Sequence, residues 1–421
     1  MIFSHGLGGS RNAYSHLVGS VASHGMIVIC PEHRDGSTPI SFVRNVPSDS
    51  ESAEKSTPRG NSTVDYMKIS HSPSPEVETA RTKQLKIRLW ELGCIHDSLL
   101  KIDDKPSSLT NLNTSSASLE SFASKLDIHE PGLITFAGHS FGAATVAQFI
   151  KTVYYSTQAA SAPPSYEPLF SPSSRSAILK QISPNTPTVL LDMWCFPMRA
   201  STTTWLWNKP MPCYTPTGPG GNAILAVESQ AFVKWRTHLL ATKRFLSHDP
   251  SSESTKPEQD SRAPPHFYYP ATSAHLSQSD FGILFPWITK RIFASEEPER
   301  CMKLNVRAIL QLLRERGLPI SATSREDMEL GSEIAAGEEI TDDKHIFGTN
   351  NEIRGWTFLS TDASDLSDVA FEKPDHVAKE EEKTTPGQAV VGGEVGEERA
   401  EAVSALGGME GTPGSPVDVG A

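Results

Sequence analysis

The chain has 421 residues, 50 acidic and 38 basic side chains, and a formal net charge of −12. Its hydrophobic content of 37% suffices for a buried core and excludes a wholly disordered chain. No run of about 18 apolar residues occurs, which argues against a membrane-spanning helix. Five cysteines without a CxxC pair argue against a disulfide scaffold and against a zinc cluster. The acidic balance argues against nucleic acid as a partner.

The negative charge is concentrated in the last quarter of the chain. Residues 321–421 hold 23 acidic and 7 basic side chains, a net charge of −16, so residues 1–320 carry +4. Residues 376–421 have 9 glycines, 9 acidic side chains and no aromatic residue, which predicts a disordered acidic tail. Residues 321–375 are predicted to be an acidic, partly ordered extension, since 346–347 and 356–359 are hydrophobic enough to dock on a core. The body is therefore predicted to span residues 1–320.

The predicted elements begin at the first residues. Residues 2–3 are typical of the end of a buried strand, 13–24 of a helix, and 26–30 of a strand buried on both faces. The abrupt beginning indicates that the first strands of the fold are missing. No basic segment followed by an apolar one opens the chain, so we expect no signal peptide and a cytoplasmic location, or secretion if the start is truncated.

The remaining body alternates apolar strands with amphipathic helices. Strands are predicted at 133–137, 188–192, 223–227 and 266–269, and helices at 77–102, 143–154, 230–240 and 304–316. Polar stretches at about 45–75, 156–175 and 247–265 are predicted loops, with a short ordered piece at 64–69. This alternation indicates an α/β fold, a mostly parallel sheet with helices on both faces. Sites in such sheets lie beyond the carboxyl ends of the strands.

The strand at 133–137 is followed by Gly138-His139-Ser140-Phe141-Gly142 and then a helix. This is a G-x-S-x-G pattern in the strand–turn–helix context of a nucleophile elbow. The turn is so tight that Ser140 is expected in a strained conformation with an exposed hydroxyl, and flanking side chains would collide, so Gly138 and Gly142 are required. The start of the helix favours negative charge beside the serine. The alternative is an ordinary glycine-rich turn.

A serine hydroxyl needs a base, and in α/β-hydrolases the chain order is Ser, acid, His. Asp192 ends the next apolar strand, where a buried carboxylate is costly unless it is paired; a turn-capping aspartate is the alternative. The candidate bases after Asp192 are His238, His248, His266 and His275. We favour His275, just past the strand at 266–269, with a solvated loop histidine as the alternative.

The tetrahedral intermediate of such a reaction needs two preorganised donors for its negative oxygen. One candidate is the N–H of Phe141 at the start of the helix. The other is the N–H of Leu7 in His5-Gly6-Leu7-Gly8-Gly9, which follows the first strand. A plain glycine-rich turn is the alternative for this loop.

These residues resemble the platelet-activating factor acetylhydrolase family, in its plasma and type II intracellular forms. The segments that carry the resemblance are 3–8, 22–25, 32–35, 138–145, 191–197 and 275–281, in order across about residues 1–315. The resemblance implies a calcium-independent α/β-hydrolase that needs no cofactor and cleaves acetyl, short or oxidised acyl chains from the sn-2 position of glycerophospholipids. It implies Ser140, Asp192 and His275 as nucleophile, acid and base, with Leu7 and Phe141 as oxyanion donors. The three polar loops and the tail then resemble the insertions and tail of a fungal member.

Two other functions stay open as alternatives. The chain could be another carboxylesterase of the same fold, or a truncated or inactive relative that acts as an interaction protein. Besides a phospholipid substrate, contact with a membrane or lipoprotein surface is expected through the aromatic segments 204–207 and 281–287. Ordinary core or lid packing is the alternative for both segments.

Overall fold

The structure, a computed structural model, describes residues 1–44, 62–109, 111, 118–252, 262–293, 295–328, 346–350 and 353–362. Its main sheet has six strands, in the order β1 (Ile2–Ser4), β4 (Phe136–His139), β5 (Thr188–Leu191), β6 (Ile224–Val227), β7 (His266–Pro270) and β8 (Trp356–Phe358). The first five pair in parallel, and β8 pairs antiparallel with β7. A separate antiparallel pair is formed by β2 (Ile40–Val43) and β3 (Ser62–Asp65).

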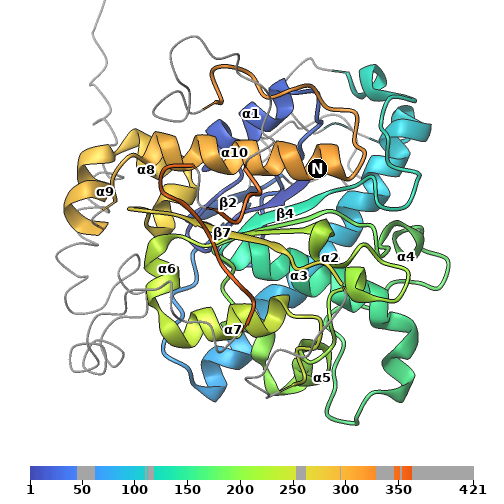
Figure 1. Ribbon diagram of the computed structural model, residues 1–421. Helices are drawn as coiled ribbons and strands as arrows, with labels where there is room; N and C mark the ends of the chain where they lie inside the picture. Colours follow the sequence, from blue (N-terminus) through green and yellow to red (C-terminus); the bar gives the residue numbers. More distant parts are fainter. Residues whose placement is uncertain are drawn as a thin grey trace, which may run out of the picture. The chain divides into compact units, whose positions relative to one another are not determined.

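Helices cover both faces of the main sheet (Figure 1). One face packs against α2 (Pro75–Asp104), α3 (Phe141–Tyr154) and α7 (Arg236–Leu246), and the other against α1 (Ser15–Ser23) and α10 (Pro298–Glu315). Successive strand residues enter opposite cores, since Phe136 joins the first and Ala137 the second. The predicted α/β class, with a mostly parallel sheet between two helical layers, is confirmed.

The remaining described helices are short. They are α4 (Ile178–Gln181), α5 (Thr204–Trp207), α6 (Gln230–Lys234), α8 (Asp280–Leu284) and α9 (Pro286–Phe293), with 3₁₀ turns between the larger elements. The long α2 begins where its sequence indicates. Pro75 occupies the first turn, and the Ser74 hydroxyl accepts the N–H of Val77, an arrangement that favours helix initiation.

Several element boundaries differ from the prediction. Residues 26–30 form a single parallel bridge, from Ile29 to Ile2 of β1, in place of a full strand. β4 starts at 136 instead of 133, because Leu133 is still held in a turn by the carbonyl of Glu130. The helix predicted at 230–240 is broken at Trp235, whose ψ of 85° is not helical. The short ordered piece predicted at 64–69 overlaps β3, whereas β2 and the short helices α8 and α9 were not predicted.

The main sheet continues beyond residue 320 through β8. Trp356 of this strand stacks on Tyr268 with ring centroids 5.1 Å apart, and Ile346 is fully buried. Residues in 346–350 and 353–362 thus contribute to the core, while the division of the chain at residue 320 stays a prediction. The predicted tail at 376–421 lies outside the described residues, as do parts of the predicted loops at 45–75 and 247–265.

Two further findings concern the whole set of described elements. Among the described residues, no helix is long and apolar enough to cross a membrane.

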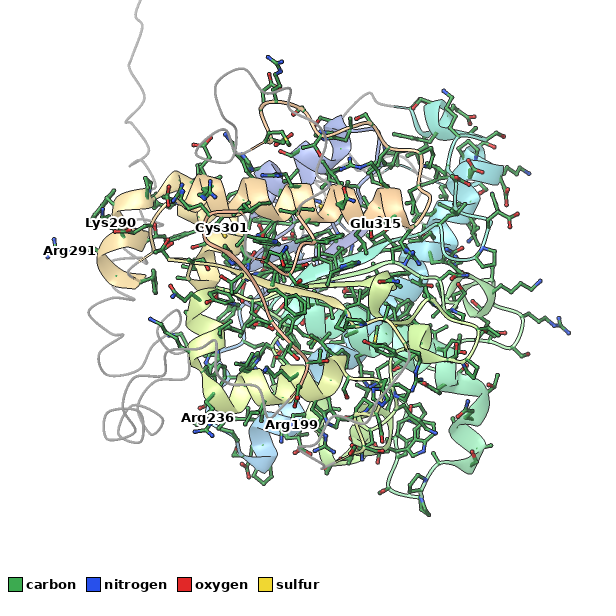
Figure 2. The ribbon with its side chains drawn as sticks, viewed as in Figure 1. Arg199, Arg236, Lys290, Arg291, Cys301 and Glu315 are labelled. Carbon is green, nitrogen blue, oxygen red and sulfur yellow. The ribbon has the colours of Figure 1, made fainter. Side chains whose placement is uncertain are left out.

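All five cysteines are free thiols, and Cys301 lies on α10 (Figure 2).

Candidate active site

The parallel ladder places two of the sequence-predicted site residues beside each other. His139 of β4 pairs with Leu191 of β5, so Ser140 and Asp192 each lie one residue beyond a strand end. The N–H of Ser140 donates to the carbonyl of Leu191 at 2.8 Å, and the N–H of Asp192 donates to the carbonyl of Val227, also at 2.8 Å. The backbone therefore fixes Ser140 and Asp192 at the carboxyl edge of the sheet, where α/β sheets place their sites.

The turn at Ser140 has the geometry of a strained elbow. Ser140 has φ 56° and ψ −119°, a conformation that side-chain-bearing residues rarely adopt. A Cβ at Gly142 would lie 1.9 Å from the carbonyl oxygen of Ser4, and one at Gly138 would lie 2.4 Å from the carbonyl carbon of Gly142. The turn thus has no room for a side chain at either glycine. Ser140 itself is only 7% exposed, so it is more enclosed than the exposed hydroxyl that the sequence predicts.

Asp192 and His275 are hydrogen-bonded partners. The carboxylate of Asp192 is fully buried; its Oδ2 accepts from Nδ1 of His275 at 2.9 Å, and its Oδ1 accepts the backbone N–H of Ser229. The pairing offsets the cost of burying this carboxylate. The His275 ring stacks on Phe232 at 4.5 Å with an interplanar angle of 4°, so its orientation is fixed on a second side.

This arrangement assigns the two nitrogens of His275 different roles. Since Nδ1 donates to Asp192, Nε2 of the neutral ring is left as the acceptor that a general base requires. The His139 ring, next to Ser140 in the chain, lies 4.4 Å from the His275 ring. Among the described residues, Ser140 has no hydrogen bond to His275; such bonds are often long in the absence of substrate and shorten when it binds.

Two backbone N–H groups next to Ser140 are available as donors. Ser4 of β1 pairs with Gly138, so the following loop reaches the turn, and a Cβ at Gly6 would lie 3.1 Å from that of Ser140. Phe141 begins α3, where N–H groups have no acceptor within the helix. Neither Leu7 nor Phe141 donates a backbone hydrogen bond to any residue that the structure describes.

A buried glutamate beside Asp192 was not singled out from the sequence. Glu228 directly follows β6, is 1% exposed, and lies close enough to Asp192 for the two carboxyl groups to interact electrostatically. Burial, reinforced by the nearby Asp192 charge, raises the pKa of Glu228 well above its ordinary value. The strand-end argument that selected Asp192 also applies to Glu228, since the strand at 223–227 was predicted.

Two of the other candidate histidines, His238 and His266, pack against aromatic rings. His238 is on α7, stacked on Trp235, and its pKa is lowered to about 3 by burial. His266 opens β7 and stacks on Phe347. Of the four histidines weighed as bases, His275 is the one that hydrogen-bonds Asp192.

Two groups in the described part of the chain have metal-ligand side chains within 4.8 Å of one another. In the first, His139, Asp192 and His275, the Nδ1 of His275 is engaged by Asp192, and that of His139 lies 2.8 Å from the Tyr14 hydroxyl. In the second, Asp103 already accepts two backbone N–H groups and pairs with His129. The Nδ1 atoms of the first group and Asp103 of the second therefore have protein partners, whereas Nε2 of His139 is buried without a hydrogen-bond partner among the described residues.

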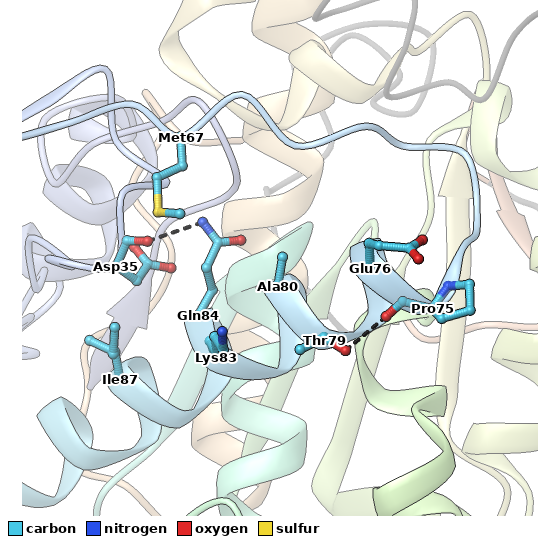
Figure 3. A pocket seen from close by; sticks show the side chains of 9 residues that line it. All are labelled: Asp35, Met67, Pro75, Glu76, Thr79, Ala80, Lys83, Gln84 and Ile87. Carbon is cyan, nitrogen blue, oxygen red and sulfur yellow. Dashed lines mark hydrogen bonds between the residues drawn. The ribbon is translucent and has the colours of Figure 1, made fainter.

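A pocket of about 570 Å³ lies beside α2 (Figure 3). Met67 and Ile87 lie at one end of it and Pro75 at the other, and Gln84 donates to the Asp35 carbonyl at 3.1 Å. Ser140, Asp192 and His275 do not line this pocket.

Comparison with known proteins indicates which family the chain resembles. The sequence profile of the family described as "Platelet-activating factor acetylhydrolase, isoform II" matches residues 1–211. A putative phospholipase A2 of Schizosaccharomyces pombe is 26% identical over 360 residues, 80% of this chain and 72% of that protein. Platelet-activating factor acetylhydrolases of Cavia porcellus and Canis lupus familiaris are each 34% identical over 35% of this chain. Those alignments span 30% and 31% of the two relatives' length.

Proposed function

The chain belongs to the platelet-activating factor acetylhydrolase, isoform II, family, and on that premise we propose that it is a serine esterase that cleaves the sn-2 acetyl, short or oxidised acyl ester of glycerophospholipids. Family membership supports a hydrolase of phospholipid esters. The observation that carries the assignment of residues is the 2.9 Å hydrogen bond between Asp192 and His275, beside the strained turn at Ser140.

In the proposed first step, Nε2 of His275 takes the proton of the Ser140 hydroxyl while its Oγ attacks the ester carbonyl carbon. The carbonyl oxygen becomes an oxyanion that accepts the N–H groups of Leu7 and Phe141. Asp192 holds the His275 tautomer and stabilises the imidazolium that forms. The C–O bond to the glycerol oxygen then breaks, and His275 returns the proton to that oxygen, so that a lysophospholipid leaves.

In the second step, water hydrolyses the acyl-enzyme on Ser140. His275 takes one proton from the water as its oxygen attacks the acyl carbon, and the bond to Ser140 Oγ breaks as His275 returns the proton to that oxygen. The products are a short carboxylic acid and the free enzyme. All the groups in this scheme belong to the protein, the substrate or water, so it requires no metal or organic cofactor.

Fluorophosphonate labelling combined with turnover of a 2-acetyl phospholipid tests the assignment. We expect Ser140→Ala to lose both labelling and turnover while circular dichroism shows an intact fold. Ser98→Ala is the control, because the Ser98 hydroxyl donates to the carbonyl of Cys94 within α2. Turnover that survives in Ser140→Ala would overturn the nucleophile. Faster hydrolysis of simple aryl esters than of acetyl phospholipids by the wild type would favour the general carboxylesterase.

We also propose that the α8–α9 region contacts the lipid surface. Leu284, at the end of α8, is 67% exposed, and Trp287 on α9 is 65% exposed. Lys290 and Arg291, also on α9, extend outward (Figure 2). Apolar and basic side chains side by side suit an interface between hydrocarbon and headgroups. The other aromatic segment does not share this exposure, since Trp207 is 6% exposed and packs on Phe245.

Sedimentation with phosphatidylcholine vesicles tests this contact. We expect Trp287→Ala to weaken vesicle binding without changing turnover of a water-soluble ester. Trp90→Ala is the matched control, because Trp90 is 61% exposed on α2. Equal effects of the two substitutions would contradict a specific role for α9.

A further inference from the structure

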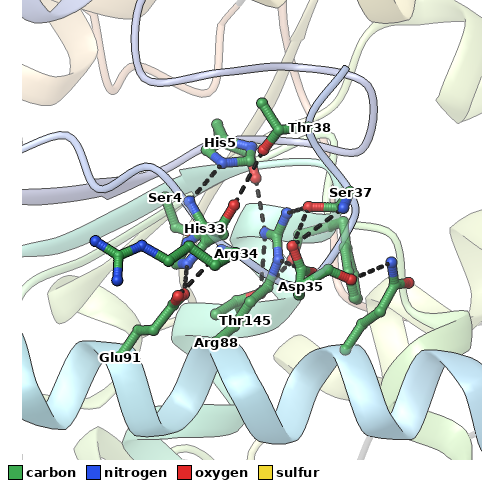
Figure 4. Close-up of polar contacts among 12 residues, drawn as sticks. Ser4, His5, His33, Arg34, Asp35, Ser37, Thr38, Arg88, Glu91 and Thr145 are labelled. Carbon is green, nitrogen blue, oxygen red and sulfur yellow. Dashed lines mark hydrogen bonds and ion pairs between the residues drawn. The ribbon is translucent and has the colours of Figure 1, made fainter. Parts of the chain in front are cut away.

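A buried arginine on α2 joins the elements that surround Ser140. Arg88 is fully buried (0% exposed), and its guanidinium donates hydrogen bonds on several sides (Figure 4). Its Nε donates to Asp35 Oδ2 at 2.7 Å, and its two terminal nitrogens donate to the carbonyl of His5 at 2.8 Å and to the hydroxyl of Ser37 at 2.5 Å. A fourth, longer contact of 3.4 Å reaches the Thr145 hydroxyl on α3.

These contacts hold both ends of the loop that carries Leu7. Arg88 bonds the His5 carbonyl directly, two residues before Leu7. On the other side, Gly8 donates its N–H to the carbonyl of Ser37 at 2.8 Å, and Ser37 is the residue whose hydroxyl Arg88 and Asp35 bind. The peptide N–H of Leu7 therefore lies between two fixed points.

The same guanidinium also contacts the second proposed donor. Its central carbon lies 4.3 Å from the centroid of the Phe141 ring, a cation–π contact with the first residue of α3. Thr145, which Arg88 contacts, donates its hydroxyl proton to the Phe141 carbonyl at 2.7 Å. One side chain thus links the segments that carry both N–H groups.

The pairing of Arg88 with Asp35 is not explained by stability alone. Both side chains are withdrawn from water, and a buried ion pair commonly contributes no more to folding than well-packed apolar residues would. Burial alone would raise the pKa of Asp35, but Arg88 and the neighbouring donors hold it below its ordinary value, so the ion pair is maintained. Arginine suits this position because its planar fork donates from three separate nitrogens, one to each acceptor, whereas an ammonium group donates from a single nitrogen.

We propose that Arg88 is a positioning residue that holds the N–H groups of Leu7 and Phe141 toward the oxyanion of the transition state. The inference rests on the proposed function, because it assumes that Ser140 attacks an ester. Arg88 does not touch the reacting atoms; it fixes the backbone that does. Its loss should therefore weaken binding of the transition state more than binding of the substrate.

Steady-state kinetics of Arg88→Lys on an acetyl ester test this role, measured where circular dichroism shows the variant folded. We expect kcat to fall on the order of 10²-fold, the loss seen when an oxyanion donor is misplaced, and KM to stay within about threefold. Inhibition by a trifluoromethyl ketone, whose adduct carries an oxyanion, should weaken in proportion to kcat/KM. An unreactive ether analogue of the substrate should bind equally well to both proteins.

Arg81→Lys is the matched control, since Arg81 is equally buried on α2 but bonds Gln84 and the Ile69 carbonyl instead of the loop. If Arg88→Lys does not fold, Ser37→Ala removes the hydroxyl that Arg88 and Asp35 bind, while it keeps the carbonyl that accepts from Gly8, and it should lower kcat by about tenfold. Equal losses in Arg81→Lys and Arg88→Lys, or equal weakening of ketone and ether, would overturn the positioning role. Failure of the wild type to label at Ser140 would instead overturn the proposed function, so the two failures are distinguishable.

Discussion

Replacing Gly142 by alanine tests the geometry of the turn at Ser140 most directly. The added Cβ would lie 1.9 Å from the Ser4 carbonyl oxygen, whereas Cβ atoms essentially never come within 3.0 Å of another atom. β1 and the start of α3 must then separate by about 1 Å. The atoms that this Cβ would meet all belong to the backbone, so no side chain can rotate to relieve the clash. Overpacking of this kind costs about 1–3 kcal/mol or more.

The same displacement should also affect catalysis. Ser4 directly precedes the loop that carries Leu7, and Gly142 directly follows Phe141, so the shift moves the two proposed oxyanion donors apart. A misplacement of about 1 Å can lower the rate on the order of 10²-fold. We therefore expect Gly142→Ala to lower both the free energy of unfolding and kcat, the latter by more than the loss of folded protein explains.

Thermal unfolding and turnover of an acetyl ester, measured on the same sample, check this expectation. The control is Gly19→Ala in α1, where an added Cβ would meet nothing within 4 Å. That change should stabilise the helix by up to about 1 kcal/mol and leave turnover unchanged. Wild-type melting temperature and wild-type kcat in Gly142→Ala would refute the reasoning.

Two further substitutions probe buried charges. Asp192→Asn should lower kcat on the order of 10⁴-fold with little change in KM, because an amide at this position favours the wrong His275 tautomer. Steady-state kinetics measure this loss. A loss of kcat below about tenfold would contradict the role of Asp192. Burial lowers the pKa of Lys151 from 10.5 to about 7. Protonating this buried amine therefore costs folding free energy, and the cost is absent above pH 10.5 and grows as the pH falls to about 7. Lys151→Met should therefore raise the free energy of unfolding, by roughly 3 kcal/mol more at pH 6 than at pH 9. Denaturant titrations at the two pH values measure this, and an equal gain at both would show that Lys151 is not desolvated as proposed.

The sequence by itself determined the buried strands of the sheet, which lie between the two helical layers, and the residues that follow these strands. Apolar runs such as 188–192 are long enough to identify buried strands, and the strands fix which residues follow them. Ser140 and Asp192 could be selected in this way because each lies one residue beyond a strand of the sheet. The G-x-S-x-G pattern is local at Gly138, where an added Cβ would meet the backbone of Gly142 in the same turn, whereas the clash at Gly142 is with the Ser4 carbonyl on β1.

Only the tertiary structure decided the contacts between segments distant in the chain. Four histidines after Asp192 were compatible with the sequence, and the hydrogen bond between Asp192 and His275, 83 residues apart, exists because β7 ends beside β6 at the same edge of the sheet. β8 joins the sheet from far along the chain, at Trp356–Phe358. Arg88 lies on a helix that the sequence predicts, but its contact with His5 spans 83 residues and has no local signature. Periodicity reports which side of an element is buried, whereas the partner of a buried polar group depends on how the elements pack.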